Sequence, residues 1–203
     1  TFQLPDGSLV TLNAASQLTY PENFNGSTRQ VSLIGEAFFN VAENPDKPFI
    51  VSARGVDAQA LGTSFNVRAY QDEPQVEVVL ATGQVKVNFA GGEPQSAAYL
   101  LPGEKAIAFE SNKSLQQVEA NLAYALGWKD NILHFQEATA EQVFTTLKKW
   151  YGVDISFLGY GTNNDWQFTG EFRNESLENV LTSISYAKSF HFKIQEKSVT
   201  IIY

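Results

Sequence analysis

The sequence contains no cysteine and no methionine, and it has only two histidines. The absence of cysteine excludes disulfides, thiolate zinc ligands and a cysteine nucleophile. Basic residues are also few, because 14 Lys and Arg face 22 Asp and Glu and give a formal charge of −8. No basic run could neutralise a series of phosphates, so the sequence excludes nucleic acid as an expected partner.

Long apolar runs are missing as well. No stretch approaches the roughly 20 consecutive apolar residues of a membrane-spanning helix, and no charged-then-apolar leader opens the chain. The chain starts at Thr1 inside an apparent strand and lacks methionine, so we expect it to be an excised part of a longer protein, with any anchor or signal upstream. Its 203 residues are 43% hydrophobic and 13% aromatic, which is enough for one large folded domain or two small ones.

Apolar and polar residues alternate from Leu4 to about Glu119, which is the pattern of half-buried β-strands. The alternation is clear at residues 9–13 and 76–78. Turn signals built from Gly, Pro, Asn and Asp separate the strands. There is no fixed-period repeat. We therefore predict an all-β N-terminal domain at residues 1–120, either a short-strand sandwich or a solenoid-like fold.

The apolar period changes to that of helices after a predicted linker at residues 121–130. Two amphipathic helices are expected, each with an apolar residue every three or four positions. The first begins after the N-cap Thr139 and ends at Gly152, and the second begins after the N-cap Ser176. With the strands around these helices, residues 131–203 predict a small α+β domain in which two helices pack on a sheet.

Two segments of this second domain align with each other without a gap. Residues 135–157 match residues 172–194 in a helix cap, an acidic residue at the second helical position and an apolar stripe in the same register. We therefore predict duplicated βαβ units, followed by one more strand formed by a hairpin. Two unrelated helical hairpins could mimic part of the alignment.

Motifs for chemistry are scarce. His134 and His191 each lie between apolar residues in a predicted strand, without the spacing of paired metal ligands. The sequence has no nucleophile elbow, phosphate-binding Gly-rich loop or dinucleotide fingerprint. The acid pair Asp72-Glu73 lies beside turn residues and is interpreted as part of a solvated loop. We expect no enzyme activity, no metal and no cofactor.

Aromatic residues are the remaining candidates for a site. Trp166, Phe168 and Phe172 are separated by even numbers of residues, with Gly170 between the last two, which places a row of aromatic side chains on one face of a strand. This face is interpreted first as the core beneath the two helices. In the alternative, part of the row, or the backbone edge of its strand, docks another chain by strand addition. The candidate partner-binding residues are Trp166, Phe168, Tyr160, Trp150 and Tyr151.

Several motifs together carry a resemblance to a known family. They are Leu4-Pro5-Asp6-Gly7, Gly35-Glu36-Ala37-Phe38-Phe39, Leu61-Gly62-Thr63-Ser64-Phe65-Asn66-Val67 and Pro102-Gly103-Glu104, in this order. With the sequence around them, they resemble the periplasmic region of FecR-family anti-sigma factors, especially the Bacteroidetes-type members. The C-terminal part is similar to the secretin/TonB short N-terminal type of domain.

This resemblance implies a role in signalling. It implies a cytoplasmic sigma-binding segment and a single inner-membrane helix upstream of Thr1, with the present chain in the periplasm. The implied partner is the N-terminal signalling domain of a TonB-dependent outer-membrane transporter, bound largely by the C-terminal domain. The signal then controls an extracytoplasmic-function sigma factor. A glycan-binding or adhesive cell-envelope domain is the alternative, with Trp166 and Tyr160 as stacking platforms, and an enzyme ranks last.

Overall fold

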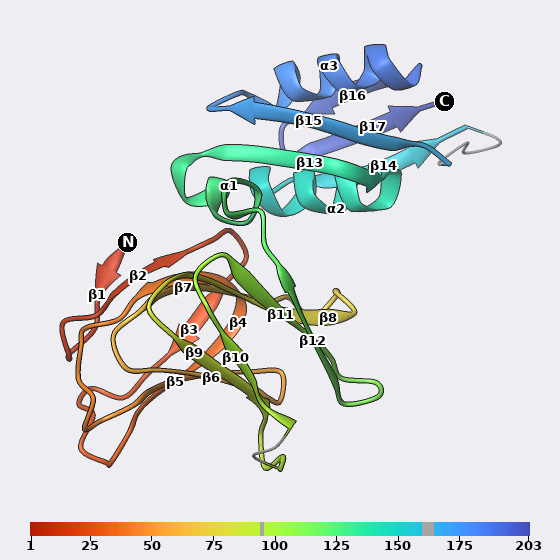
Figure 1. Ribbon diagram of the computed structural model, residues 1–203. Coiled ribbons are helices and arrows are strands. Elements are labelled where there is room, and N and C mark those ends of the chain that lie inside the picture. Colours follow the sequence, from red (N-terminus) through yellow and green to blue (C-terminus); the bar gives the residue numbers. More distant parts are fainter. Residues whose placement is uncertain (94–95, 160–164) are drawn as a thin grey trace. The chain divides into compact units, whose positions relative to one another are not determined.

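The computed structural model describes residues 1–93, 96–159 and 165–203. The chain divides into two compact units, Thr1–Lys129 and Asp130–Tyr203 (Figure 1). Each unit has its own hydrophobic core, built from buried residues of that unit. The two units are therefore described separately.

The first unit is built from strands. They are β1 (Phe2–Gln3), β2 (Leu9–Leu12), β3 (Gln17–Thr19), β4 (Arg29–Asn40), β5 (Phe49–Ala53), β6 (Val56–Ala60), β7 (Ser64–Ala69), β8 (Gln75–Thr82), β9 (Val85–Phe89), β10 (Ala98–Leu100), β11 (Glu104–Phe109) and β12 (Ser114–Glu119). The order along the sheet is β10-β9-β6-β5-β4-β7-β8-β11-β12, with β2 and β3 also paired to β4, and β1 paired to β2. The all-β prediction is confirmed.

The sheet of the first unit curls until its two ends meet. Strand β10, at one end of the order, contacts β11 and β12 at the other end. The side chain of Gln117 in β12 donates a hydrogen bond to the backbone oxygen of Tyr99 in β10, at 3.2 Å. The architecture is therefore one nearly closed sheet, where the sequence predicted a short-strand sandwich or a solenoid-like fold. Apolar alternation identifies strands but does not say which strands pair, and this accounts for the difference.

Strand β4 is the longest strand of this sheet and forms a corner of the sheet. Its first half pairs with β3 and β5, and its second half pairs with β2 and β7. The change of partners falls at Gly35, whose φ is +93°. On both sides of this glycine, alternate residues such as Leu33 and Phe39 enter the core. The Phe39 ring stacks on the ring of Phe65 with centroids 5.3 Å apart.

The turn at the start of the chain is held by a buried ion pair. Arg29 is 2% exposed, and its Nη1 donates to Oδ2 of Asp6 and to the backbone oxygen of Ala42, each at 2.7 Å. Asp6 also accepts hydrogen bonds from the backbone and the hydroxyl of Ser8. The Leu4-Pro5-Asp6-Gly7 motif therefore belongs to the scaffold of the first unit.

The segment expected as a linker forms helical turns. Helix α1 (Leu122–Leu126) has Asn121 as its N-cap, and a 3₁₀ helix follows at Gly127–Asp130. The side chain of Asn121 accepts a hydrogen bond from the backbone of Tyr124, as N-cap residues do. Among the described residues, no helix is both long and apolar enough to cross a membrane.

In its described residues, the second unit has two helices and five strands. They are β13 (Ile132–Thr139), α2 (Ala140–Tyr151), β14 (Asp154–Leu158), β15 (Gln167–Arg173), α3 (Leu177–Lys188), β16 (His191–Gln195) and β17 (Ser198–Ile202). The predicted helices and their caps are confirmed: Thr139 forms a capping box, Ser176 caps α3, and Gly152 ends α2 in the left-handed conformation. The predicted α+β class of this unit is confirmed as well.

The strands of the second unit form two separate sheets. β13 pairs with β15 in a two-stranded sheet, and β14, β17 and β16 form a three-stranded sheet. Both helices connect the first sheet to the second, because α2 leads from β13 to β14 and α3 leads from β15 to β16. A βαβ unit needs two parallel strands of one sheet, and neither connection provides this. The order strand-helix-strand does recur, but the prediction of duplicated βαβ units is not confirmed.

Replacement of Gly35 by alanine tests the corner of β4. A Cβ atom at Gly35 would lie 2.3 Å from the hydroxyl oxygen of Ser16 and 2.8 Å from its Cα. We expect Gly35→Ala to lower the free energy of unfolding by about 3 kcal/mol or more, measured by urea denaturation. The control Gly55→Ala has a similar positive φ and nothing within 4 Å, so it should cost only about 1 kcal/mol. Equal losses at the two positions would contradict this account.

Candidate functional site

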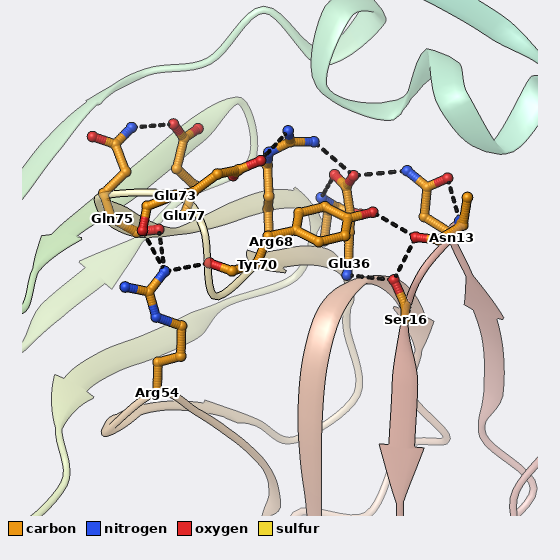
Figure 2. A network of polar contacts seen from close by, with 11 residues as sticks. Asn13, Ser16, Glu36, Arg54, Arg68, Tyr70, Glu73, Gln75 and Glu77 are labelled. Carbon is orange, nitrogen blue, oxygen red and sulfur yellow. Dashed lines mark hydrogen bonds and ion pairs between the residues drawn. The ribbon is translucent and has the colours of Figure 1, made fainter. Parts of the chain in front are cut away.

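A network of polar side chains lies on the outer face of β4, β7 and β8 in the first unit (Figure 2). Its centre is Glu36, which is 3% exposed although its neighbour Ala37 occupies the core side of the strand. Oε1 of Glu36 accepts a hydrogen bond from the side-chain amide of Asn66 at 2.9 Å. Oε2 accepts from Asn13 at 2.8 Å and from Nη1 of Arg68 at 2.9 Å. The buried carboxylate thus meets one cation and two amide donors.

Arg68 joins Glu36 to a second carboxylate. Its Nε and Nη2 donate to the two carboxylate oxygens of Glu73 at 2.8 and 2.6 Å, which is a bidentate pair. The guanidinium carbon also lies 5.0 Å from the centre of the Tyr70 ring. Glu73 lies in the loop between β7 and β8, as predicted, but its side chain is not a freely solvated carboxylate, because Arg68 of β7 pairs with it.

Burial and charge shift the pKa values of this network. Burial raises the pKa of the Glu36 carboxyl, against the opposing effects of Arg68 and the two amides. Burial acts to lower the pKa of Arg68, but the charges of Glu36 and Glu73 outweigh it, so this pKa is raised above its usual value. Burial, with the nearby charge of Glu36, raises the pKa of Tyr70 to about 12. Arg68 therefore stays charged and Tyr70 neutral at physiological pH.

The network extends to the last residues of the first unit. The indole N–H of Trp128 donates to the side-chain oxygen of Asn66 at 3.3 Å. The ammonium of Lys129 lies 5.7 Å from the centre of the Phe38 ring on β4. The helical segment that ends this unit is thereby fixed to the outer face of β4 and β7. These groups bind one another, so the network is a structural centre of the fold.

The predicted aromatic row faces the core of the second unit. Trp166, just before β15, is partly buried and contacts the rings of Phe144 and Phe190, with centroids 5.8 and 6.5 Å away. Phe168 stacks against the ring of Phe172, with centroids 6.1 Å apart. The first interpretation of this row, as core beneath the helices, describes its packing. Contact with a partner through its remaining exposed area stays a prediction.

The other candidates come from the end of α2 and from a loop. Trp150 and Tyr151 are partly buried against the same core. The hydroxyl of Tyr151 donates to the backbone oxygen of Glu175 at 2.9 Å, and burial raises the pKa of that hydroxyl. Tyr160 lies outside the described residues. Binding of a partner by these residues also stays a prediction.

Sequence reasoning missed a hollow beside β15. A concave region of about 330 Å³ lies between β15 and α3 and is lined by Phe172, Glu175, Asn179, Thr182 and Ser183. The last three come from the polar face of α3, opposite its buried Val180, Leu181 and Ile184. Small hydroxyl and amide side chains at intervals of three or four were the sequence signal for this face. The polar network was also missed, although Glu36 stands as a single charge among apolar residues of β4.

These features define a chain with one nearly closed β unit and one small α+β unit. Comparisons with known proteins identify its family. The family model described as "FecR protein" matches residues 1–86, and the model described as "FecR, C-terminal" matches residues 132–201. Together, the two family models match residues in both units.

Solved structures give a match over nearly the whole chain. Two crystal structures of a candidate anti-sigma factor from Parabacteroides distasonis ATCC 8503, at 1.65 and 2.50 Å resolution, are each 34% identical in sequence, with a TM-score of 0.85. They cover 98% and 99% of this chain, and 92% of the matched chain in each case. A comparison with curated proteins gave no match. The chain belongs to the FecR family of anti-sigma factors.

Removal of the charge at the centre of the network tests its structural role. Glu36→Gln replaces a carboxylate that accepts three hydrogen bonds by an amide whose NH₂ faces a donor. We expect the free energy of unfolding to fall by about 3 kcal/mol, measured by urea denaturation. The control Glu77→Gln alters a carboxylate that pairs with Lys105 and is 23% exposed, and it should cost less than about 1 kcal/mol. A loss no larger for Glu36→Gln than for Glu77→Gln would refute the role assigned to Glu36.

Proposed function

We propose that this chain is the periplasmic sensor portion of a transmembrane anti-sigma regulator. It binds the N-terminal signalling domain of a TonB-dependent outer-membrane transporter and relays the signal to an extracytoplasmic-function sigma factor. The sigma factor is contacted by a cytoplasmic segment outside this sequence, and a single helix upstream anchors the protein in the inner membrane. The observation that carries the proposal is the family match, which covers both units of the chain.

The geometry supports binding as the task of this chain. The most highly organised polar site, around Glu36, is built from groups that satisfy one another. His134 lies 3.4 Å from the carboxylate of Glu171 on the surface of β13 and β15, and no group of three potential metal ligands is found in the described part of the chain. We propose no enzyme activity for this chain.

A sensor of this kind must also distinguish two states. A partner changes an equilibrium only if it binds the two states of the regulator with different affinities. The second unit suits this task, because its two sheets have two and three strands in the residues that the structure describes, and sheets this small present strand edges. The nearly closed sheet of the first unit presents fewer such edges.

Calorimetric titration tests the proposed partner. The chain of residues 1–203 is titrated with the signalling domain of the transporter encoded beside its gene, and we expect saturable binding with a dissociation constant of about micromolar order. The signalling domain of a transporter encoded elsewhere in the genome serves as the control and should bind at least about tenfold more weakly. Absence of both heat and NMR shift changes with the cognate domain would refute the proposal.

The glycan-binding alternative makes a different prediction. It needs a free aromatic face on Trp166, and the ring contacts with Phe144 and Phe190 occupy part of this side chain. If this alternative held, Trp166→Ala would abolish sugar binding while the fold survived. We expect instead no saturable binding of envelope oligosaccharides by the unmodified chain in the same calorimeter.

A further inference from the structure

We propose that the groove between β15 and α3 binds an extended strand of the partner protein, which adds to the outer edge of β15. The two-stranded sheet of β13 and β15 would then gain a third strand. This inference rests on the proposed function, because it says where on the chain the partner domain docks. We infer it from the outward-facing backbone groups of β15, from the groove between β15 and α3, and from the carboxylate of Glu175 in that groove.

The free edge of β15 can be assigned from its hydrogen bonds to β13. The backbone N–H of Ala140 donates to the oxygen of Trp166, and the N–H of Asn174 donates to the oxygen of Asn131. In an antiparallel pair, the groups that bond to one neighbour recur at every second residue. The even-numbered residues 166–174 therefore bond toward β13.

It follows that the odd-numbered residues of β15 face the other way. The backbone N–H and C=O groups of Thr169, Glu171 and Arg173 point to the side of β15 opposite β13. Among the described residues, no strand pairs with β15 on this side. A row of unpaired donors and acceptors over a seven-residue strand is a template for an added strand.

A groove beside Phe172, near the C-terminal end of this edge, leaves room for side chains of an added strand. Phe172 contributes an apolar surface on the side of β15, and Asn179, Thr182 and Ser183 of α3 form a polar wall. In Figure 1, α3 lies along the side of β15 that is opposite β13. The small side chains of the wall leave a hollow of about 330 Å³, so side chains of the added strand can enter between strand and helix.

The lining also defines the chemistry of the occupant. Glu175 is the one charged residue among the five that line the groove, and its Oε2 accepts a hydrogen bond from Asn179. A Lys or Arg of the incoming strand would pair with this carboxylate. An apolar residue two positions away would lie on Phe172, because side chains of a strand that share a face are two residues apart. The groove therefore fits an extended segment that carries an apolar and a basic residue on one face.

The outer edge of β13 is a poorer template. The pairing of β13 shifts register between Phe135 and Ala138, and Glu137 there has a φ of +48°. Such a bulge bends a strand edge and discourages pairing. The edge of β14 is the main competitor, because Leu158 on it is 61% exposed. The experiment below separates β14 from β15.

Removal of one outward N–H tests the docking edge. Glu171→Pro deletes a donor that faces away from β13, a position where edge strands tolerate proline. Binding of the cognate transporter signalling domain to the chain 1–203 should weaken at least about tenfold in calorimetry. The matched variant Glu171→Gln keeps the N–H while it removes the same carboxylate, and it should bind within about threefold of the unmodified chain.

A second pair of variants tests the groove without touching the strand backbone. Ser183→Trp fills the hollow from the helix side and should weaken binding at least about tenfold. Tyr186 lies one turn further along α3, is 93% exposed and does not line the groove. Tyr186→Trp places the same large side chain beside the groove and should leave the affinity unchanged. If Glu171→Pro fails to fold, the comparison of Ser183→Trp with Tyr186→Trp still tests whether the partner docks in the groove.

Hydrogen exchange of the unmodified chain completes the test. On binding of the same domain, the amides of Thr169, Glu171 and Arg173 should become protected. Saturable binding with protection at β14 in place of β15, or with full affinity in Glu171→Pro and Ser183→Trp, would overturn this inference and leave the proposed function intact. No binding by the unmodified chain would overturn both.

Discussion

The pairing of the buried Glu36 carboxylate is the interaction on which the first unit depends. A carboxylate that is 3% exposed is tolerated only if donors replace its lost water. Asn13 supplies one donor from the segment between β2 and β3, and Asn66 and Arg68 supply the others from β7. The requirement to satisfy one charge thus brings together β4, β7 and the segment after β2. Through Asn66 and Trp128, it also fixes the segment that leads to the second unit.

The two units solve the problem of strand edges differently. The sheet of the first unit turns at Gly35 and curls until β10 meets β12, which leaves its apolar faces inside one core. The second unit divides its strands between two small sheets and places the apolar stripes of both helices in the core between them. Open edges remain on such sheets. A nearly closed scaffold joined to a small unit with open edges suits the proposed role, in which the protein holds its own shape while it binds another chain.

Local features of the fold could be predicted from the sequence, and long-range ones could not. Alternation identified the strands of the first unit, and the caps Thr139 and Ser176 gave the starts of both helices, because these signals act within a few residues. Sheet closure and the separation of β13 from β14 depend on contacts far apart in sequence, so they were missed. The same reason explains the site: the aromatic row was visible as a pattern, whereas the partners of Glu36 and the groove beside β15 depend on the fold.

The proposal that this FecR-family chain receives its signal through the open-edged second unit can be tested by a crystal structure of residues 1–203 in complex with the signalling domain of the cognate transporter. We expect a strand of that domain in backbone hydrogen bonds with Thr169 and Glu171 of β15, and a basic side chain beside Glu175. A complex in which the domain contacts only the first unit would refute the role proposed for the second unit.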